Sequence, residues 1–134
     1  MIRDHLAPAL KEQFPQQPFV FGEHPAPIAT IEAPCAEIGP LSICDDGDEV
    51  TVYIDHATHS HFGCYDENLT LEEKEKKIAA EVVTFLSALF VDRVVVFRIF
   101  GGWAGGWRML KPEEKSPRRS FIWQQFLWSK PLQN

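Results

Sequence analysis

The chain has 134 residues, of which 45% are hydrophobic, and its ten Phe and four Trp can fill the core of one domain spanning residues 1–134. The formal net charge is −6, and no Lys/Arg run is longer than Arg118-Arg119, which argues against nucleic acid and against an anionic membrane as partners. No apolar run approaches the ~18 residues of a membrane span, and the N-terminus lacks a signal-peptide core. The three cysteines are widely spaced and fit neither a disulfide framework nor a zinc ribbon. We therefore expect a cytoplasmic protein.

The first elements predicted are a short helix and an extended segment. Residues 4–14 predict a helix with Asp4 as its N-cap, Pro8 in its first turn, and Leu6 and Leu10 on its apolar side. Residues 15–27 contain four prolines around Phe19-Val20-Phe21, which indicates an extended segment that lies against the domain. Residues 28–32 are expected to form a strand.

A β-hairpin is predicted next. Residues 41–44 and 49–56 alternate in polarity on either side of Asp46-Gly47, and Asp-Gly between such runs is a strong hairpin signal. Val50, Val52 and Ile54 are expected to face the core. Thr51, Tyr53 and Asp55 are expected to face the other way.

A long helix is predicted over residues 71–90. Thr70 and Glu73 have the spacing of a capping box, in which each side chain satisfies a backbone N–H of the other residue. The helical spacing predicts one buried and one exposed face. Residues expected to be buried are Leu71, Ile78, Val82, Phe85 and Leu89, and those expected to be exposed are Glu72, Glu75 and Lys76.

The rest of the chain predicts further strands. Residues 93–100 form a β-branched run typical of a buried strand, and residues 107–110 are expected to return as its neighbour after a Gly-rich turn. Residues 120–128 indicate an aromatic strand, although periodicity alone does not exclude a helix there. The predicted fold class is α+β: a mainly antiparallel sheet of five or six strands, with the long helix packed on one face and a short N-terminal helix.

The order strand, helix, strand over residues 49–100 suggests a crossover. A helix packed on a sheet returns the chain to the edge it left, which would make strands 49–56 and 93–100 parallel. Their C-terminal ends would then lie side by side, with the loop of residues 57–69 above them. Ligands often bind outside such ends.

Two unusual segments would meet at that edge. One holds His56, His59 and His61, and His59-x-His61 on extended backbone puts two imidazoles on one face. These histidines suit zinc binding, acid–base chemistry or local hydrogen bonding. The sequence spacing does not give a complete set of metal ligands, so we predict no metal and no cofactor. The other is residues 101–107, a Gly/Trp loop that fits no phosphate-binding pattern and is either a binding loop or a hairpin with its tryptophans packed on the sheet. The candidate binding residues are therefore His56, His59, His61, Arg98, Trp103, Trp107 and Arg108.

Two stretches carry a family resemblance. Residues 50–56 running into 59–62, and residues 92–96 running into the Gly/Trp loop, resemble a loose group of small bacterial proteins, some of them similar to the immunity partners of secreted toxins. The resemblance implies a small protein-binding domain and brings no catalytic residue to this chain.

Three functions remain open at this point. The first is a non-enzymatic protein-binding domain, in one form an immunity-like inhibitor of a basic partner protein, since the chain is acidic. The second is a small metal-binding protein or hydrolytic enzyme that uses His56, His59 and His61. The third is a homodimer subunit that pairs through its aromatic C-terminal strand.

Overall fold

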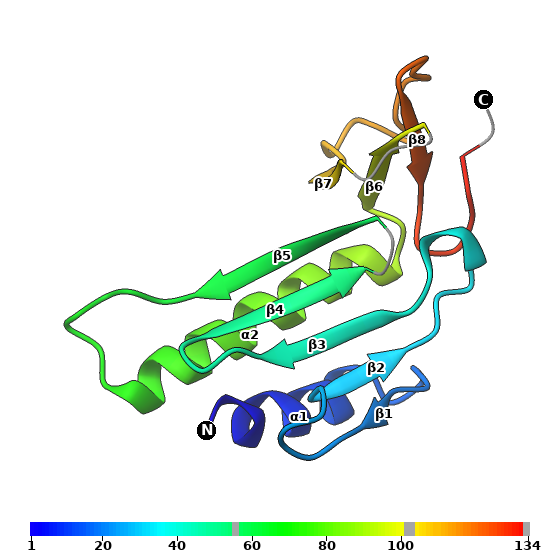
Figure 1. Cartoon of the computed structure of the whole chain (residues 1–134). Coiled ribbons are helices and arrows are strands. Elements are labelled where there is room, and N and C mark those ends of the chain that lie inside the picture. Colours follow the sequence, from blue (N-terminus) through cyan, green and yellow to red (C-terminus); the bar gives the residue numbers. More distant parts are fainter. Residues whose placement is uncertain (55–56, 101–103, 133–134) are drawn as a thin grey trace.

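The computed structural model describes residues 1–54, 57–100 and 104–132. It has an α+β architecture, as the sequence predicts (Figure 1). The structure contains a five-stranded antiparallel sheet, a second three-stranded sheet, one long helix and a short N-terminal helix. A short 3-10 helix, η1 (Ala36–Ile38), connects two strands of the larger sheet.

The larger sheet is an antiparallel meander with the strand order β1-β2-β3-β4-β5. The predicted hairpin of β3 and β4 is confirmed, and its turn contains Gly47 at φ 90°, a left-handed conformation that favours glycine. The strands are β1 (Val20–Phe21), β2 (Ala29–Ile31), β3 (Leu41–Asp45), β4 (Glu49–Ile54) and β5 (Thr58–Gly63).

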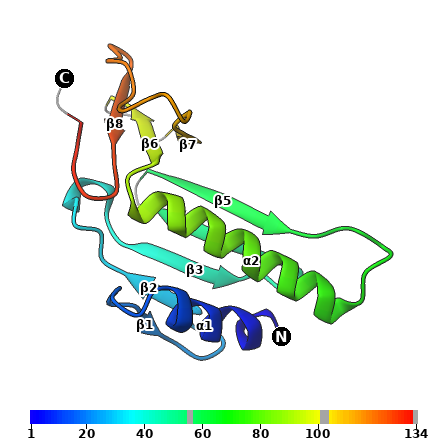
Figure 2. The same ribbon diagram turned by 180° about the vertical axis from the view of Figure 1, so that it is seen from behind.

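Both helices, α1 (Ile2–Gln13) and α2 (Leu71–Phe90), pack on the same face of this sheet, behind it in Figure 1 and in front of it in Figure 2. Thr70 and Glu73 form the predicted capping box, with distances of 2.9 and 3.2 Å. Within the described residues, neither helix combines the length and the apolar character that crossing a membrane requires.

The N-terminal helix begins earlier than predicted. It starts at Ile2, and Asp4 accepts a hydrogen bond from the N-terminal ammonium group at 3.0 Å. Pro8 consequently lies in the second turn, where its ring removes a helical hydrogen bond. Burial of Ile2, Leu6 and Leu10 against the core offsets this cost. Helix propensities alone do not include the free energy of that burial.

The buried face of α2 is confirmed for Ile78, Val82, Phe85 and Leu89, but two expectations at its start are wrong. Leu71 is 72% exposed, because the first turn of α2 projects beyond the β3–β4 hairpin (Figures 1 and 2). The Glu75 side chain is only 12% exposed, because it faces the N-terminus of α1 and lies 3.7 Å from the Met1 ammonium nitrogen.

The smaller sheet consists of β6 (Val94–Ile99), β7 (Gly105–Met109) and β8 (Trp123–Phe126), in the order β7-β6-β8 with antiparallel neighbours. The predicted parallel crossover is therefore wrong, because β4 and β6 belong to different sheets. The physical reason is β5: it forms from residues that the sequence suggested were a loop, and it occupies the edge of β4 that β6 would need. Residues 120–128 contain a strand rather than a helix.

One apolar core joins the two sheets. Val94, Val96, Phe126 and Trp128 pack in the same buried cluster as the helices and the larger sheet. Phe126 and Trp128 are 1% and 3% exposed, so these two side chains of the C-terminal strand region pack inside this chain. Phe121 and Ile122 of the same region are exposed, and the homodimer hypothesis stays a prediction.

The loop between β7 and β8 is anchored by two arginines. Arg93 donates hydrogen bonds to the carbonyl groups of Glu114 and Lys111 at 2.8 and 2.5 Å. Arg108 donates to both carboxylate oxygens of Glu114, at 3.1 and 3.0 Å. This bidentate hydrogen bonding lowers the pKa of Glu114 to about 2.

The Glu114 ion pair predicts a defined dependence of stability on pH. Since the folded-state pKa is below the ordinary value of 4.5, the ionised carboxylate stabilises the folded state above that value, and the contribution disappears as the pH falls to about 2. Thermal melts of Glu114→Gln and the unmodified protein should differ most near neutral pH and converge at about pH 2. Glu113→Gln is the control, because among the described residues the exposed Glu113 forms no ion pair. A difference that does not change with pH would contradict the assignment.

Candidate functional site

The helices cover one face of the larger sheet and leave its opposite face uncovered (Figures 1 and 2). The alternation along β4 and β5 decides which side chains lie there. Phe62 of β5 packs on Phe85 of α2, with ring centroids 5.5 Å apart, so it lies on the helix side. His59 and His61 therefore lie on the opposite face.

His59 and His61 meet edge to face, with ring centroids 5.0 Å apart. Their partners across the strand pair are Tyr53 and Thr51 of β4. The Tyr53 and His59 rings are 5.8 Å apart. The sequence pattern His-x-His thus correctly predicts two imidazoles on one face.

Thr51 is the centre of a polar network next to these histidines. The side chain is fully buried, although the sequence pattern places it on the polar face. Its hydroxyl donates a hydrogen bond to the Asp46 carboxylate and lies 3.0 Å from Nδ1 of His61. Glu49 Oε2 lies 3.4 Å from the same nitrogen, and the Tyr65 hydroxyl donates to the Glu49 carboxylate.

The network resembles a hydroxyl–imidazole–carboxylate triad only in composition. In such a triad the hydroxyl attacks the substrate and the imidazole takes its proton. Here the Thr51 hydroxyl donates to Asp46 and is inaccessible to any substrate, because the side chain has no exposed surface. The arrangement orients His61, whose side chain is 54% exposed, and gives Thr51 a structural role.

We predict that Thr51→Val destabilises the protein by about 1 kcal/mol, because the substitution removes the hydrogen bonds of the buried Thr51 hydroxyl, while its exposed partners Asp46 and His61 can bind water instead. The measurement is the free energy of unfolding in urea. Thr51→Ser retains the hydroxyl and should lose less. Equal losses for Val and Ser would assign the effect to packing of the methyl group instead.

A metal site is not evident on this face. No group of three or more His, Cys, Asp or Glu residues within residues 1–54, 57–100 and 104–132 is arranged to hold a metal ion. His56 lies outside the described residues, so the absence of a bound metal stays a prediction. The three cysteines are free thiols, and Cys35 and Cys64 are buried.

Of the other sequence-predicted site residues, Arg98, Trp107 and Arg108 have partners other than the histidines. Trp107 packs on Phe85 of α2, with ring centroids 4.7 Å apart. Arg98 donates to Gln124 at 3.0 Å and lies over the Phe126 ring, and Arg108 pairs with Glu114. Trp103 lies outside the described residues.

The two segments do touch at one point. A Cβ atom on Gly105 would lie 2.2 Å from the carbonyl oxygen of Ala57, so the start of β7 abuts the residue just before β5. That contact is made by backbone. Among the described residues, it brings the ends of the segments together without gathering His59, His61, Trp107 and the two arginines into one cleft.

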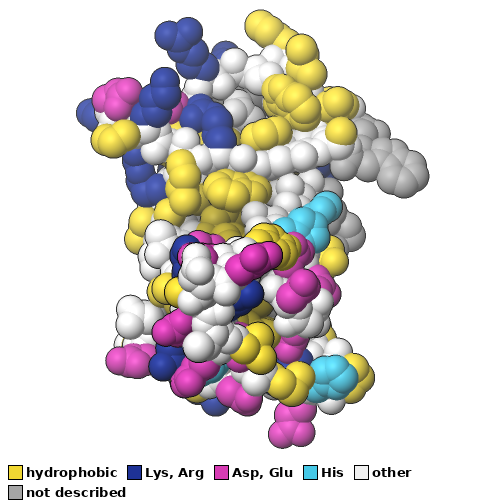
Figure 3. Space-filling model, turned by 90° about the vertical axis from the view of Figure 1, so that its left-hand side faces the viewer, with side chains coloured by type: hydrophobic (Ala, Val, Ile, Leu, Met, Phe, Trp, Pro, Cys, Tyr) yellow, Lys and Arg dark blue, Asp and Glu magenta, His cyan; other side chains and the backbone are white. Residues whose placement is uncertain are grey.

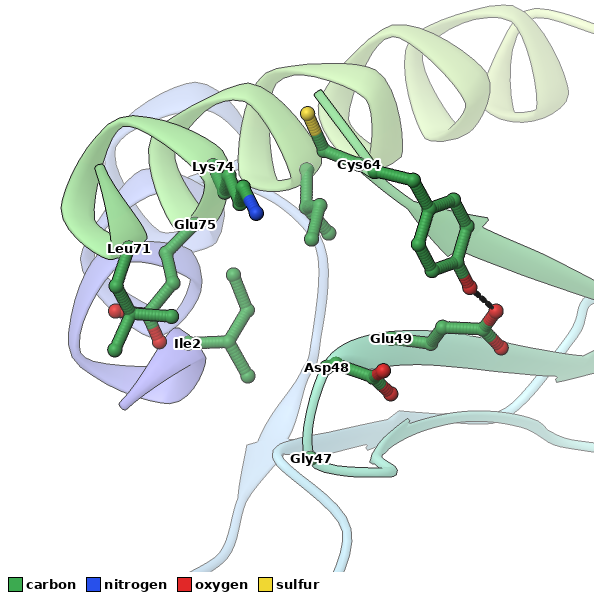
Figure 4. A pocket seen from close by; sticks show the side chains of 10 residues that line it. Ile2, Gly47, Asp48, Glu49, Cys64, Leu71, Lys74 and Glu75 are labelled. Atoms are coloured by element: carbon green, nitrogen blue, oxygen red, sulfur yellow. Dashed lines mark hydrogen bonds between the residues drawn. The ribbon is translucent and has the colours of Figure 1, made fainter. Parts of the chain in front are cut away.

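Sequence reasoning missed a cavity at the end of the sheet near the β3–β4 hairpin. The cavity has a volume of about 140 Å³ and lies between the hairpin, the residues after β5, the first turns of α2 and the start of α1 (Figure 4). Its apolar walls are Ile2, Leu71 and Ile78. The charged and polar residues that line it are Asp48, Glu49, Cys64, Tyr65, Lys74 and Glu75.

Charge is separated along the molecule, which the net value of −6 conceals. Residues 91–134 contain eight of the 13 Lys and Arg residues but three of the 19 Asp and Glu residues, so their formal charge is +5 and that of residues 1–90 is −11. Figure 3 shows Asp and Glu side chains gathered over the helices and the hairpin, and Lys and Arg over the smaller sheet. We call the first region the acidic end, defined by Asp46, Asp48, Glu49, Asp66, Glu67, Glu72, Glu73 and Glu75.

Comparisons of the chain with protein-family models, with curated proteins and with solved structures find no match.

Proposed function

We propose that the protein is a non-enzymatic binding domain whose acidic end docks a basic protein. The observation that carries the proposal is the exposure of two large apolar side chains among the carboxylates there: Tyr65 is 67% exposed and Leu71 is 72% exposed. Protein interfaces combine such apolar anchors with a charged rim. The carboxylates would steer a basic partner toward the anchors.

The cavity suits a lysine or arginine side chain of that partner. Its volume of about 140 Å³ and its apolar walls match the aliphatic stem of such a residue. Asp48 and Glu49 lie across the cavity from Lys74 in Figure 4, and their carboxylates would face the charged group. Binding along the hairpin side would keep the partner's cation away from the Lys74 ammonium.

The form of this function that we propose is an immunity-like inhibitor, a small domain that covers a basic surface of another protein. In the neighbouring histidine network, the Thr51 hydroxyl is buried and inaccessible to a substrate, which supports binding rather than hydrolysis by that network. The paired histidines would then border the interface, because His61 and the cavity share Glu49.

A peptide-display selection tests the proposal with a defined probe. Random ten-residue peptides selected on the unmodified protein should be enriched in Lys and Arg together with an apolar residue. The selected peptides should bind Asp48→Lys or Leu71→Ala at least about tenfold more weakly, a change that corresponds to 1.4 kcal/mol.

Two matched controls separate a site from net charge. Glu23→Lys makes the same change in charge at an exposed position away from the acidic end, and Val20→Ala truncates an apolar side chain that is 69% exposed. Both should retain peptide binding. Equal weakening in Asp48→Lys and Glu23→Lys, or a selection without basic peptides, would overturn the proposal.

A further inference from the structure

The end of the molecule opposite the hairpin carries an excess of positive charge. The loop between β7 and β8 contributes four exposed cationic side chains, those of Lys111, Lys115, Arg118 and Arg119, which we call the basic loop. Its Glu114 carboxylate is already neutralised by the bidentate pair with Arg108. The exposed Glu113 offsets one of these cations, and the loop still presents a net positive charge to the outside.

Large apolar side chains project directly beside these cations. Phe121, two residues after Arg119, is 101% exposed, and Ile122 is 63% exposed. Phe100 is 46% exposed, and its backbone N–H donates to the Ile122 carbonyl at 3.3 Å, so the two segments are adjacent. Exposed apolar side chains that cluster in this way mark interaction sites.

We propose that this basic and apolar end binds the surface of an anionic lipid membrane. Cationic side chains near such a surface are attracted to its anionic lipids, and adjacent aromatic and aliphatic side chains enter the boundary between headgroups and acyl chains. The apolar groups here project from the surface, with Phe121 fully exposed, whereas a folded protein partner would need a matching recess. The acidic end would face away from the membrane.

The net charge of −6 does not oppose this arrangement. At physiological ionic strength, exposed charges more than about 8 Å apart are largely screened from each other. A membrane would therefore act on the cations next to it rather than on the carboxylates around the hairpin. The expectation of no membrane partner rested on the net charge, which does not register the separation of the charges.

Flotation with vesicles tests the proposal on the full-length chain. The protein should float with vesicles that contain phosphatidylglycerol in phosphatidylcholine, should not float with phosphatidylcholine alone, and should be released by high salt. Phe121→Ala/Ile122→Ala and Arg118→Gln/Arg119→Gln should each weaken binding to the anionic vesicles at least about tenfold. These side chains are exposed, so circular dichroism should show folded variants.

The controls repeat the same chemistry elsewhere. Lys76→Gln/Lys77→Gln removes two exposed cations of α2, and Val20→Ala truncates an exposed apolar side chain; both should bind vesicles normally. The Asp48→Lys variant at the acidic end should also bind vesicles normally. The vesicle result would therefore stand even if the proposed protein-binding function failed.

Three results would overturn the membrane proposal. One is an absence of binding to the anionic vesicles. Another is equal binding by the Phe121→Ala/Ile122→Ala variant and the unmodified protein. The last is binding of a single-stranded oligonucleotide with the same affinity and the same dependence on Arg118 and Arg119, which would identify a general polyanion surface.

Discussion

Phe85→Ala should lower the free energy of unfolding by about 3–5 kcal/mol, the usual cost of removing a buried phenyl ring and leaving a cavity. Phe85 is 2% exposed on α2, and its ring contacts both sheets, with centroids 5.5 Å from Phe62 of β5 and 4.7 Å from Trp107 of β7. The loss should therefore reduce amide hydrogen-exchange protection in both sheets.

Urea denaturation measures this loss, and Phe121→Ala is its matched control. Both variants remove a phenyl ring, but Phe121 is fully exposed and makes no comparable packing contribution. The Phe121 variant should therefore unfold at nearly the same urea concentration as the unmodified protein. A loss below about 1 kcal/mol for Phe85→Ala would mean that the ring is not part of the core.

Gly105→Ala should destabilise the protein by about 3 kcal/mol, the upper end of the usual cost of overpacking. The added Cβ would lie 2.2 Å from the Ala57 carbonyl oxygen and 2.6 Å from the Phe97 carbonyl oxygen. Both obstacles are backbone atoms, so no side-chain rotation relieves the clash. The start of β7 would have to move away from β6 and from the end of the larger sheet.

Gly106→Ala is the neighbouring control. Its added Cβ would meet the Phe97 ring at 2.8 Å, and a ring at the end of a side chain can turn aside. We expect a loss of about 1 kcal/mol for this variant, measured by the same denaturation experiment. Equal losses of stability for the two variants would contradict the idea that the close approach of Ala57 requires glycine at position 105.

The two proposals concern opposite ends of one molecule. The acidic end combines carboxylates with exposed Tyr65 and Leu71, and the other end combines the basic loop with exposed Phe121 and Ile122. Each pairs charge of one sign with apolar side chains, and each has variants that leave the other end unchanged. The peptide and vesicle experiments therefore test them independently.

Local sequence signals located most of the secondary structure. The Asp-Gly turn and the alternation around it predict β3 and β4, and the capping box of Thr70 and Glu73 predicts the first residue of α2. These signals work because they depend on atoms within a few residues of one another. The pair His59 and His61 was predictable for the same reason, since alternation along one strand places both on one face.

Only the tertiary structure decided how the elements combine. Residues 58–63 pair with β4 as the next strand of the meander, and this pairing excludes β6 from the larger sheet and separates Arg98 and Arg108 from the histidines. Leu71 is exposed because α2 extends beyond the hairpin. Helical periodicity does not predict this exposure, because it depends on the length of the helix relative to the strands. The sequence by itself determined most of the elements other than β5, the shared face of His59 and His61, and the amount of charge at each end of the chain. The fold decided which residues share a surface, because burial and strand pairing depend on neighbours that are distant in sequence.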